Sequence, residues 1–304
     1  MDNILWIIKY QEYNSHYNAY GLDIKGALHS EYLANRSYVL SQRKIIKNSK
    51  QVKLTNDKLI FFRYMKACGI PTPAVFAVII DGKILDLNFQ PVDMETLKER
   101  KNYFIKPIRG SLGSGIEQIH DFEEYCKSKE NFMKGRFIVQ ESVTQHSEMN
   151  KLNPKSVNTL RLVTIMDKNG EVSLFSRLLR IGTSKSGYVD NWAKGSLIVG
   201  ITKDGGLKKY GFYQPGFGTK EQMHPDSKIE FETFKIPYYS QAEEAVIRAH
   251  KFFYDMYSVG WDVAITENGC VIIEGNNLWN INGFQTANCG LKKKWHDAVK
   301  MYQA

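Results

Sequence analysis

The stretch that decides the fold is Gly260-Trp261-Asp262-Val263-Ala264-Ile265-Thr266-Glu267-Asn268-Gly269-Cys270-Val271-Ile272-Ile273-Glu274-Gly275-Asn276-Asn277. It contains two apolar-rich runs on either side of Glu267-Asn268-Gly269, and a three-residue connection that ends in Gly is typical of a β-hairpin. This loop length predicts that Thr266 pairs with Cys270. One face of the hairpin then belongs to the core, and its residues are Val263, Ile265, Val271 and Ile273.

The other face of this hairpin carries three oxygen-bearing side chains. Counting outward from the loop places Asp262 directly opposite Glu274, with Asn276 two residues further along. Two facing carboxylates repel each other unless a positive charge lies between them, and Asp, Glu and Asn oxygens favour Mg²⁺ over Zn²⁺. The pattern therefore predicts a magnesium site of the kind that also binds substrate phosphates. The alternative is a surface hairpin whose acids are solvated.

Composition limits the class of protein. The chain has 304 residues, with 43% hydrophobic and 24% charged residues, which is ordinary for a soluble globular protein. Its net charge of +9 fits an anionic partner, and nucleic acid, anionic lipid, nucleotide phosphates and acidic sugars all satisfy it. The cysteines are far apart, which argues against a zinc site or a disulfide scaffold and favours the reducing cytoplasm. No transmembrane segment is expected, because no apolar run is long enough.

The N-terminal part of the chain has its own composition. Residues 1–52 contain no proline and mix tyrosines with lysines and arginines. Such a mixture could bind single-stranded nucleic acid by stacking, but the spacing lacks the strand pattern of a stacking platform. We therefore predict a helical N-terminal region over residues 1–52 and no nucleic-acid partner.

A second motif lies in the middle of the chain. Tyr103-Phe104-Ile105-Lys106-Pro107 is predicted to be a short strand that leads into residues 108–115, a loop with three glycines and two serines. Backbone N–H groups of such a loop can approach a phosphate closely, and Lys106 would place an ammonium group beside it. The spacing matches neither a P-loop nor a dinucleotide fingerprint. The alternative is a solvated lysine at the end of a strand.

The chain then becomes rich in β-structure. Strands predicted over residues 156–166 and 171–181 carry Arg161, Arg177 and Arg180. A strand arginine that points into a cleft can bind phosphate or carboxylate oxygens in bidentate fashion, whereas on an exposed face it only meets solvent. We interpret Arg177 and Arg180 as solvent-facing. Further along, residues 190–195 fit either a substrate loop or a surface turn, and a long amphipathic helix is predicted over residues 239–257.

Together these segments resemble the ATP-grasp enzymes. Besides Lys106 and its loop, the resemblance rests on Gln140-Glu141, Asn158-Thr159-Leu160-Arg161, Gly260-Trp261-Asp262 and Ile273-Glu274-Gly275-Asn276. More narrowly, Leu152-Asn153-Pro154, Ser156-Val157-Asn158 and Asp190-Asn191-Trp192 are similar to the sugar-transfer-associated ATP-grasp group, which is linked to bacterial surface-polysaccharide genes. The resemblance extends from residue 55 to residue 290. It implies an α+β ATP-grasp fold in which two subdomains, over residues 53–145 and 146–304, hold ATP between them.

The resemblance also implies roles for individual residues in binding ATP and Mg²⁺. Lys106 and Lys58 would contact phosphates, and Arg161 would steady the γ-phosphate or an acyl phosphate. The magnesium ligands would be Asp262, Glu274 and Asn276. The lid over the phosphates would include Gly110, Ser111, Gly113 and Ser114. The adenine hinge would consist of Glu141 and Val143, and the ribose contact would be Glu148.

The activity that the resemblance implies is an ADP-forming carboxylate–amine ligase. Its small-molecule substrates would be an amino acid and a sugar or uronic acid for capsule or O-antigen, with Asp190, Asn191 and Lys194 contacting the acceptor. An acidic glycan precursor would suit the basic chain. A kinase acting on a sugar or polyol hydroxyl would share the same nucleotide half. A third reading is a nucleotide- or RNA-binding module without catalysis, against which Lys106 and the metal trio argue.

Overall fold

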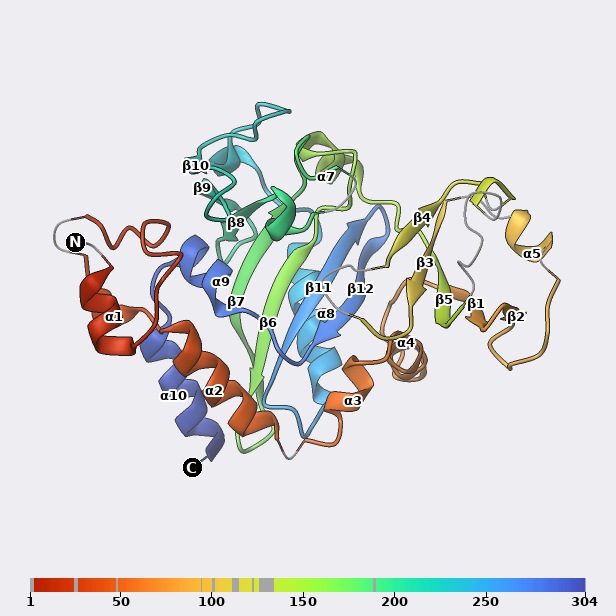
Figure 1. The fold of residues 1–304 in the computed structure, drawn as a ribbon, viewed down its shortest axis with the longest axis horizontal. Helices are drawn as coiled ribbons and strands as arrows, with labels where there is room; N and C mark the ends of the chain where they lie inside the picture. The colour runs from red at the N-terminus through yellow and green to blue at the C-terminus, as the bar shows by residue number, and fades with distance from the viewer. Residues whose placement is uncertain are drawn as a thin grey trace.

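The computed structural model describes residues 3–24, 27–47, 49–93, 95–99, 102–110, 115–121, 123–125, 134–187 and 190–303. Within them the chain forms helices and two antiparallel sheets, so the predicted α+β class is confirmed (Figure 1). The smaller sheet has the strand order β2-β1-β5-β3-β4 and the larger one β10-β9-β8-β7-β6-β11-β12. The smaller sheet lies on the side of the β12 edge of the larger sheet (Figure 1).

The smaller sheet comes from the first half of the chain. Its strands are β1 (Val75–Ile80), β2 (Lys83–Leu85), β3 (Tyr103–Pro107), β4 (Glu117–Ile119) and β5 (Arg136–Glu141), and its helices are α4 (Lys58–Ala67) and α5 (Glu95–Lys98). Helix α4 begins after Asp57, whose side chain accepts a hydrogen bond from the Ile60 N–H. Its residues Leu59 and Phe62 pack against Val78 and Ile138 of the sheet. The helix is therefore fixed to one face of the sheet, which positions Lys58 at its first turn.

The larger sheet forms the body of the protein. Its strands are β6 (Leu160–Met166), β7 (Val172–Ile181), β8 (Leu197–Ile201), β9 (Leu207–Tyr213), β10 (Lys220–Glu221), β11 (Ser258–Thr266) and β12 (Gly269–Asn276). Helix α8 (Tyr239–Lys251) covers one face and packs its residues Val246 and Ala249 against the main core. The predicted helix over residues 239–257 was therefore too long at its C-terminal end, where the Nε2 of His250 instead bonds the Met256 carbonyl at 2.8 Å.

The opposite face of the larger sheet is only partly covered. Helices α2 (Asn35–Ile46), α9 (Ile281–Asn288) and α10 (Lys292–Gln303) pack there around an aromatic core that includes Tyr38, Phe284 and Trp295. Strand residues alternate between faces, so Arg161 shares this face with Val163 of the same core. Arg161, Arg180 and Asp262 line a cavity beside these helices, so the helices do not cover them.

The N-terminal region contains helices and turns and packs on the C-terminal helices. It contains α1 (Ile4–Tyr10), η1 (His29–Glu31) and α2, followed by α3 (Val52–Thr55). Tyr20 donates its hydroxyl to Asn282, and the Leu33 N–H donates to Gln285, both in α9. Short elements elsewhere are α7 (Ser147–Leu152), η2 (Trp192–Lys194) and η3 (Phe231–Thr233). In the described part of the chain, every helix is too short or too polar to cross a bilayer.

The hairpin of β11 and β12 confirms one prediction and corrects another. Asp262 pairs with Glu274, as predicted, but Thr266 pairs with Gly269 instead of Cys270. The turn is thus one residue shorter than expected, and a bulge between Asp262 and Val263 restores the register. The predicted core face is correct for Val263 and Ile265 only; Ile272 is fully buried in place of Val271 and Ile273, which are half-buried.

Candidate functional site

A cavity of about 1140 Å³ lies between the two sheets. This volume exceeds the roughly 300–1,000 Å³ of ordinary ligand pockets, so the cavity has room for a nucleotide and a second molecule. It brings together most of the site residues predicted from sequence, namely Lys58, Lys106, Gly110, Glu141, Val143, Arg161, Asp190, Asn191, Lys194, Asp262, Glu274 and Asn276. Ser111, Gly113 and Ser114 lie outside the described residues.

Three neighbouring strands place the charged floor of the cavity. Asp262 on β11 pairs with Glu274 on β12 and, on its other side, with Arg161 on β6. Directly paired residues point to the same face of a sheet. Arg161 Nη2 donates to Asp262 Oδ2 at 2.9 Å, and Arg161 Nε lies 2.5 Å from Asp262 Oδ1. The carboxylate that the sequence pattern offered to a cation is therefore held by a guanidinium.

Asp262 is the most deeply buried of these groups, with 4% of its surface exposed. Burial raises the pKa of its carboxyl group to about 7, although Arg161 and Arg180 both oppose this rise. For Glu274 burial acts in the same direction but is outweighed by Arg161 and by a hydrogen bond from Asn276 Nδ2 at 3.0 Å, so its pKa lies below the usual value. Among the described residues, Asp262 Oδ1 accepts no hydrogen bond of good geometry, and its partner is the guanidinium of Arg161, whose Nε lies 2.5 Å away.

The three oxygen donors fit a hard divalent cation. Asp262, Glu274 and Asn276 supply two carboxylates and an amide, the ligand types that Mg²⁺ prefers, and all three line the same cavity. Among the described residues no cluster of three or more His, Cys, Asp or Glu side chains could hold a metal ion. The candidate site therefore depends on further oxygen atoms from a ligand.

Arg180 is the site residue that the sequence analysis misjudged. Its Nη2 lies 3.0 Å from Asp262 Oδ2, and its Nε and Nη2 donate to Thr159 Oγ1 at 3.0 and 2.8 Å. The pKa of Arg180 is raised, because Asp190 and Asp262 outweigh its burial. Arg177 points elsewhere and donates to the Tyr239 hydroxyl at 2.8 Å. The odd spacing of the two arginines was the available signal, since it puts them on opposite faces of one strand.

The residues predicted to contact the acceptor substrate differ in how far other protein groups already engage them. Asp190 Oδ2 accepts the backbone N–H of Thr159 at 3.1 Å and also its hydroxyl, and it lies 3.5 Å from Arg180 Nε. Asn191 caps η2 by accepting the Ala193 N–H at 3.0 Å. Lys194 is exposed at the cavity wall. Asp190 therefore holds the arginine in place, and Lys194 remains the accessible charge.

The smaller sheet supplies the other cationic groups. Lys106 Nζ donates to Gln140 Oε1 at 2.8 Å, and Lys58 Nζ donates to the Gly110 carbonyl at 3.2 Å. Burial and the neighbouring charge of Lys58 lower the pKa of Lys106 to about 8, against the opposing effect of Glu274. An ammonium group with this pKa lacks an adequate anionic partner. A phosphate in the cavity would supply that partner.

The connection between the sheets contains Glu141 and Val143, the two residues for which an adenine-hinge role was predicted. Glu141 uses its Oε1 to accept the Ala74 N–H at 2.6 Å, so its carboxylate is engaged inside the protein. Val143 lines the cavity, and within the described residues its peptide N–H and C=O have no hydrogen-bond partner. Glu148 in α7 lies outside the cavity lining and pairs with Lys151 at 2.7 Å on the surface. The structure thus does not bring Glu148 together with the other candidates.

The sequence profile of the sugar-transfer associated ATP-grasp family matches residues 40–298, which is most of the chain. The protein is a member of the sugar-transfer associated ATP-grasp family. The resemblance seen in the sequence motifs is thereby confirmed, and the two-sheet arrangement is the ATP-grasp fold. Residues 1–39, which carry α1 and η1, lie outside the part matched to this family.

Solved structures of ATP-grasp proteins are similar in fold. A biotin carboxylase from Campylobacter jejuni in complex with β,γ-ATP is 11% identical, with a TM-score of 0.51 over 83% of this chain and 46% of that one. The VanG D-Ala:D-Ser ligase from Enterococcus faecalis is 14% identical, with a TM-score of 0.49 over 82% of this chain and 62% of that one. The ATP-grasp chain described here spans less than two thirds of the length of either of these two chains. No curated protein matches it in sequence.

Proposed function

We propose that this ATP-grasp protein is an ADP-forming ligase that activates a carboxylate as an acyl phosphate and joins it to an amine. The observation that carries the proposal is the arrangement of charges in one cavity. The larger sheet supplies Arg161, Arg180, Asp262 and Glu274, and the smaller sheet supplies Lys106. Such preorganised charges suit phosphoryl transfer, because catalysis there is mainly positioning and electrostatic stabilisation.

ATP would lie along the wall formed by the smaller sheet. The peptide group of Val143, which is unpaired within the described residues, would offer a donor and an acceptor to the adenine edge. Lys106 and Lys58 would bind the phosphates, and the lid predicted from Gly110 onward would cover them. The cavity wall does not include Glu148, so a ribose contact by this residue would require movement of α7.

Asp262, Glu274 and Asn276 would hold Mg²⁺ beside the phosphates. When bound, the ion would neutralise part of the negative charge that develops on the phosphoryl oxygens. The chain's own contribution is to fix the carboxylates. Arg161 and Arg180 hold Asp262 from two sides, and the amide of Asn276 holds Glu274.

The two chemical steps follow from the same arrangement. A carboxylate oxygen of the donor attacks the γ-phosphorus, the bond to the β,γ-bridging oxygen breaks, and ADP leaves. The amine then attacks the carbonyl carbon, inorganic phosphate leaves, and the amine loses a proton. Arg161 and Arg180 would orient the transferred phosphoryl group and the donor carboxylate, because guanidinium groups match both in bidentate fashion.

The substrates would be small molecules, one of them acidic, from surface-polysaccharide biosynthesis such as capsule. Lys194 at the wall supports an acidic group, and Asn191 would lie beside it. We expect the reaction in the cytoplasm, which the free thiols of Cys68, Cys270 and Cys289 would tolerate. No nucleic-acid partner is proposed.

A trapping experiment tests this reaction. Uronic acids and amino acids labelled with ¹⁸O in the carboxylate are incubated with ATP, Mg²⁺, a panel of amines and the purified chain. An acyl-phosphate ligase transfers one ¹⁸O atom to inorganic phosphate and forms a hydroxamate when hydroxylamine replaces the amine. A stable phosphorylated sugar or polyol, formed without any amine, would identify a kinase instead. Absence of ATP consumption with every pair contradicts both activities.

A further inference from the structure

Helix α1 leaves most of its apolar side chains in solvent. Four of its seven residues are large, apolar and 42–72% exposed, namely Ile4, Leu5, Ile7 and Ile8. Trp6 is the residue of this helix that is buried. Successive residues of an α-helix are turned by about 100°, so Ile4 and Ile8 point away from the side that Trp6 packs against the body. The four exposed side chains form an apolar patch, which we call the α1 patch.

Exposed apolar side chains are concentrated in this part of the chain. Within the described residues 17 large apolar side chains are exposed, and seven of them lie in the first 28 residues, where Tyr13, Ile24 and Leu28 add to the α1 patch. A large exposed apolar patch on a soluble protein typically marks a contact with another protein or with a membrane. The segment also lies outside the part of the chain matched to the family, so family membership does not explain the patch.

Two ammonium groups lie at the C-terminal end of α1. The Nζ atoms of Lys9 and Lys292 are 5.3 and 5.6 Å from the centre of the Tyr10 ring. Lys292 Nζ also donates to the Tyr10 hydroxyl at 3.4 Å. Lys292 is the first residue of α10, so the N-terminal end of that helix, which carries the exposed Lys293, meets the end of α1.

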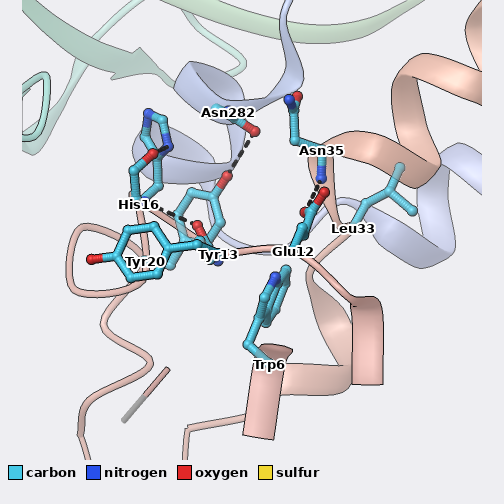
Figure 2. Close-up of a pocket in the computed structure, with 10 residues that line it drawn as sticks. Trp6, Glu12, Tyr13, His16, Tyr20, Leu33, Asn35 and Asn282 are labelled. Atoms are coloured by element: carbon cyan, nitrogen blue, oxygen red, sulfur yellow. Dashed lines mark hydrogen bonds between the residues drawn. The ribbon is translucent and has the colours of Figure 1, made fainter. Parts of the chain in front are cut away.

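Helix α2 brings further positive charge to the same place. Glu12, two residues after α1, accepts the N–H of Asn35 at 2.8 Å (Figure 2) and that of Arg36 at the same distance. These bonds engage the Glu12 carboxylate and hold the first turn of α2 beside the end of α1. From there the exposed basic residues of α2 recur on one side of the helix, at Arg36, Arg43 and Lys44.

This end of the molecule carries most of the positive charge of the chain. Residues 1–50 and 291–304 contain 11 lysines and arginines against five acids, so 64 of the 304 residues account for two thirds of the net charge of +9. Anionic lipid headgroups attract such clusters of basic residues, and an apolar helix face adds to the binding. Exposed apolar side chains flanked by positive charge are therefore the combination that fits an anionic membrane surface.

A second copy of this chain fits the α1 patch less well. A stable protein interface uses roughly 20–30 residues a side, whereas seven exposed apolar side chains are available in this segment. In a symmetric dimer the same surface would face itself, so Lys9 and Lys293 of one copy would approach the basic residues of the other. Like charges oppose such a contact.

We propose that α1 docks the protein on the surface of an anionic membrane. The α1 patch would enter the boundary between headgroups and acyl chains, where amphipathic helices lie about 5–10 Å deep. The basic residues of α2 and α10 would contact the lipid headgroups. Helix α1 lies at the end of the molecule opposite the smaller sheet (Figure 1). The proposal goes beyond ligase activity and does not depend on it.

Vesicle flotation of the full chain tests the docking. Purified protein is mixed with vesicles of phosphatidylcholine alone, or with vesicles that also contain about 30% phosphatidylglycerol as anionic lipid, and the floated fraction is measured. We expect at least tenfold tighter binding to the anionic vesicles. Added salt should weaken this binding, because it screens the attraction between charges. The measurement needs no ATP or substrate, so its failure differs from failure of the ligase proposal.

A variant and its matched control localise the apolar contact. Ile8→Glu places a charge in the middle of the α1 patch and should weaken binding to the anionic vesicles at least tenfold. Ile60→Glu makes the same exchange at an exposed position of α4, beside the smaller sheet, and should bind like the wild-type protein. Far-UV circular dichroism and thermal unfolding check that both variants keep the fold.

Two double charge reversals localise the electrostatic contact. Arg43→Glu combined with Lys44→Glu should weaken binding to the anionic vesicles at least tenfold. Lys83→Glu combined with Arg136→Glu gives the same net charge through exposed residues of the smaller sheet, and its effect should stay below threefold.

Three results would overturn the proposal. Wild-type protein that does not float with the anionic vesicles lacks the docking surface. Equal loss of binding in Ile8→Glu and Ile60→Glu would place the contact elsewhere. A dimer that light scattering detects without vesicles, and that Ile8→Glu converts to a monomer, would show that a second copy of the chain covers the α1 patch.

Discussion

Arg180 Nη2 lies 3.0 Å from Asp262 Oδ2, and this ion pair spans β6, because Arg180 belongs to β7 and Asp262 to β11. Both side chains are largely buried, at 18% and 6% exposure. Burial would make either charge costly alone, so each group is tolerated because the other is present. The charge of Arg180 also opposes the rise in the pKa of Asp262 that burial causes. The carboxyl group of Asp262 is thus held in a fixed position at the cavity wall.

Loss of Arg180 should therefore destabilise the protein in a way that Mg²⁺ corrects. Arg180→Ala leaves Asp262 and Asp190 without this partner, and we expect the free energy of unfolding to fall by about 3 kcal/mol. Mg²⁺ should stabilise this variant more than the wild-type protein, because the freed carboxylate binds the cation. Urea unfolding with and without Mg²⁺ measures both effects.

Arg177→Ala is the matched control for this experiment. Arg177 is equally buried in the same strand and lies 3.3 Å from Glu243, away from the cavity. Its removal should also destabilise the protein, but Mg²⁺ should restore nothing beyond its effect on the wild type. Equal restoration of both arginine variants by Mg²⁺ would contradict a metal site at Asp262.

Removal of the Asp262 charge should stop catalysis and leave the fold intact. Asp262→Asn keeps the shape of the side chain, while Arg180 keeps its contact with Asp190. We expect ATP-dependent turnover to fall by roughly 10²–10³-fold or more, the loss typical of a missing electrostatic contact to the transition state. ADP release measures turnover, and far-UV circular dichroism checks the fold. The control variant Glu243→Gln, which breaks an ion pair outside the cavity, should keep nearly wild-type activity. Wild-type activity in Asp262→Asn would rule out the proposed metal site.

The hairpin shows how far the sequence could predict this site. Alternation of residues correctly indicated that Asp262 faces Glu274. The turn was one residue too long in the prediction, and the error did not reach the site because a bulge compensates for it. Three successive apolar residues, 271–273, contain no alternation that would reveal such a bulge. The alternation of residues therefore predicted which side chains share the face of the sheet that carries the site. It did not predict the bulge between the turn and the site.

Contacts between distant parts of the chain were harder to predict. The strand over residues 103–107 was predicted with its observed bounds, whereas the one predicted from residue 156 begins at Leu160. Residues before it stay out of the sheet because the Asn158 side chain bonds Gln145 and the Met149 and Asn153 carbonyls. The choice of Arg180 over Arg177 likewise depends on Asp190 and Asp262, which are remote in sequence.

The position of Glu148 leads to a prediction about the ribose contact. Glu148 is exposed, pairs with Lys151 and lies outside the cavity lining. We expect Glu148→Ala to change the Kd for ADP less than twofold, because the side chain of Glu148 does not line the cavity in which ADP would bind. Lys58→Ala, at the cavity wall, should weaken ADP binding by at least tenfold in the same calorimetric titration. A comparable loss in Glu148→Ala would instead show that α7 closes over the nucleotide.

The lowered pKa of Lys106 predicts how nucleotide binding depends on pH. In the free protein this pKa is about 8, because burial and Lys58 disfavour the charged form; a bound phosphate would favour that form and raise the pKa. The protonated lysine is the form that binds, so ADP affinity should be constant below pH 8 and fall about tenfold per pH unit above it. Calorimetry at pH 9 in buffers of different ionisation enthalpy should show uptake of about one proton on binding. Lys106→Arg keeps a permanent charge, so its affinity should stay constant up to pH 9, and an unchanged pH dependence in this variant would assign the titration to another group.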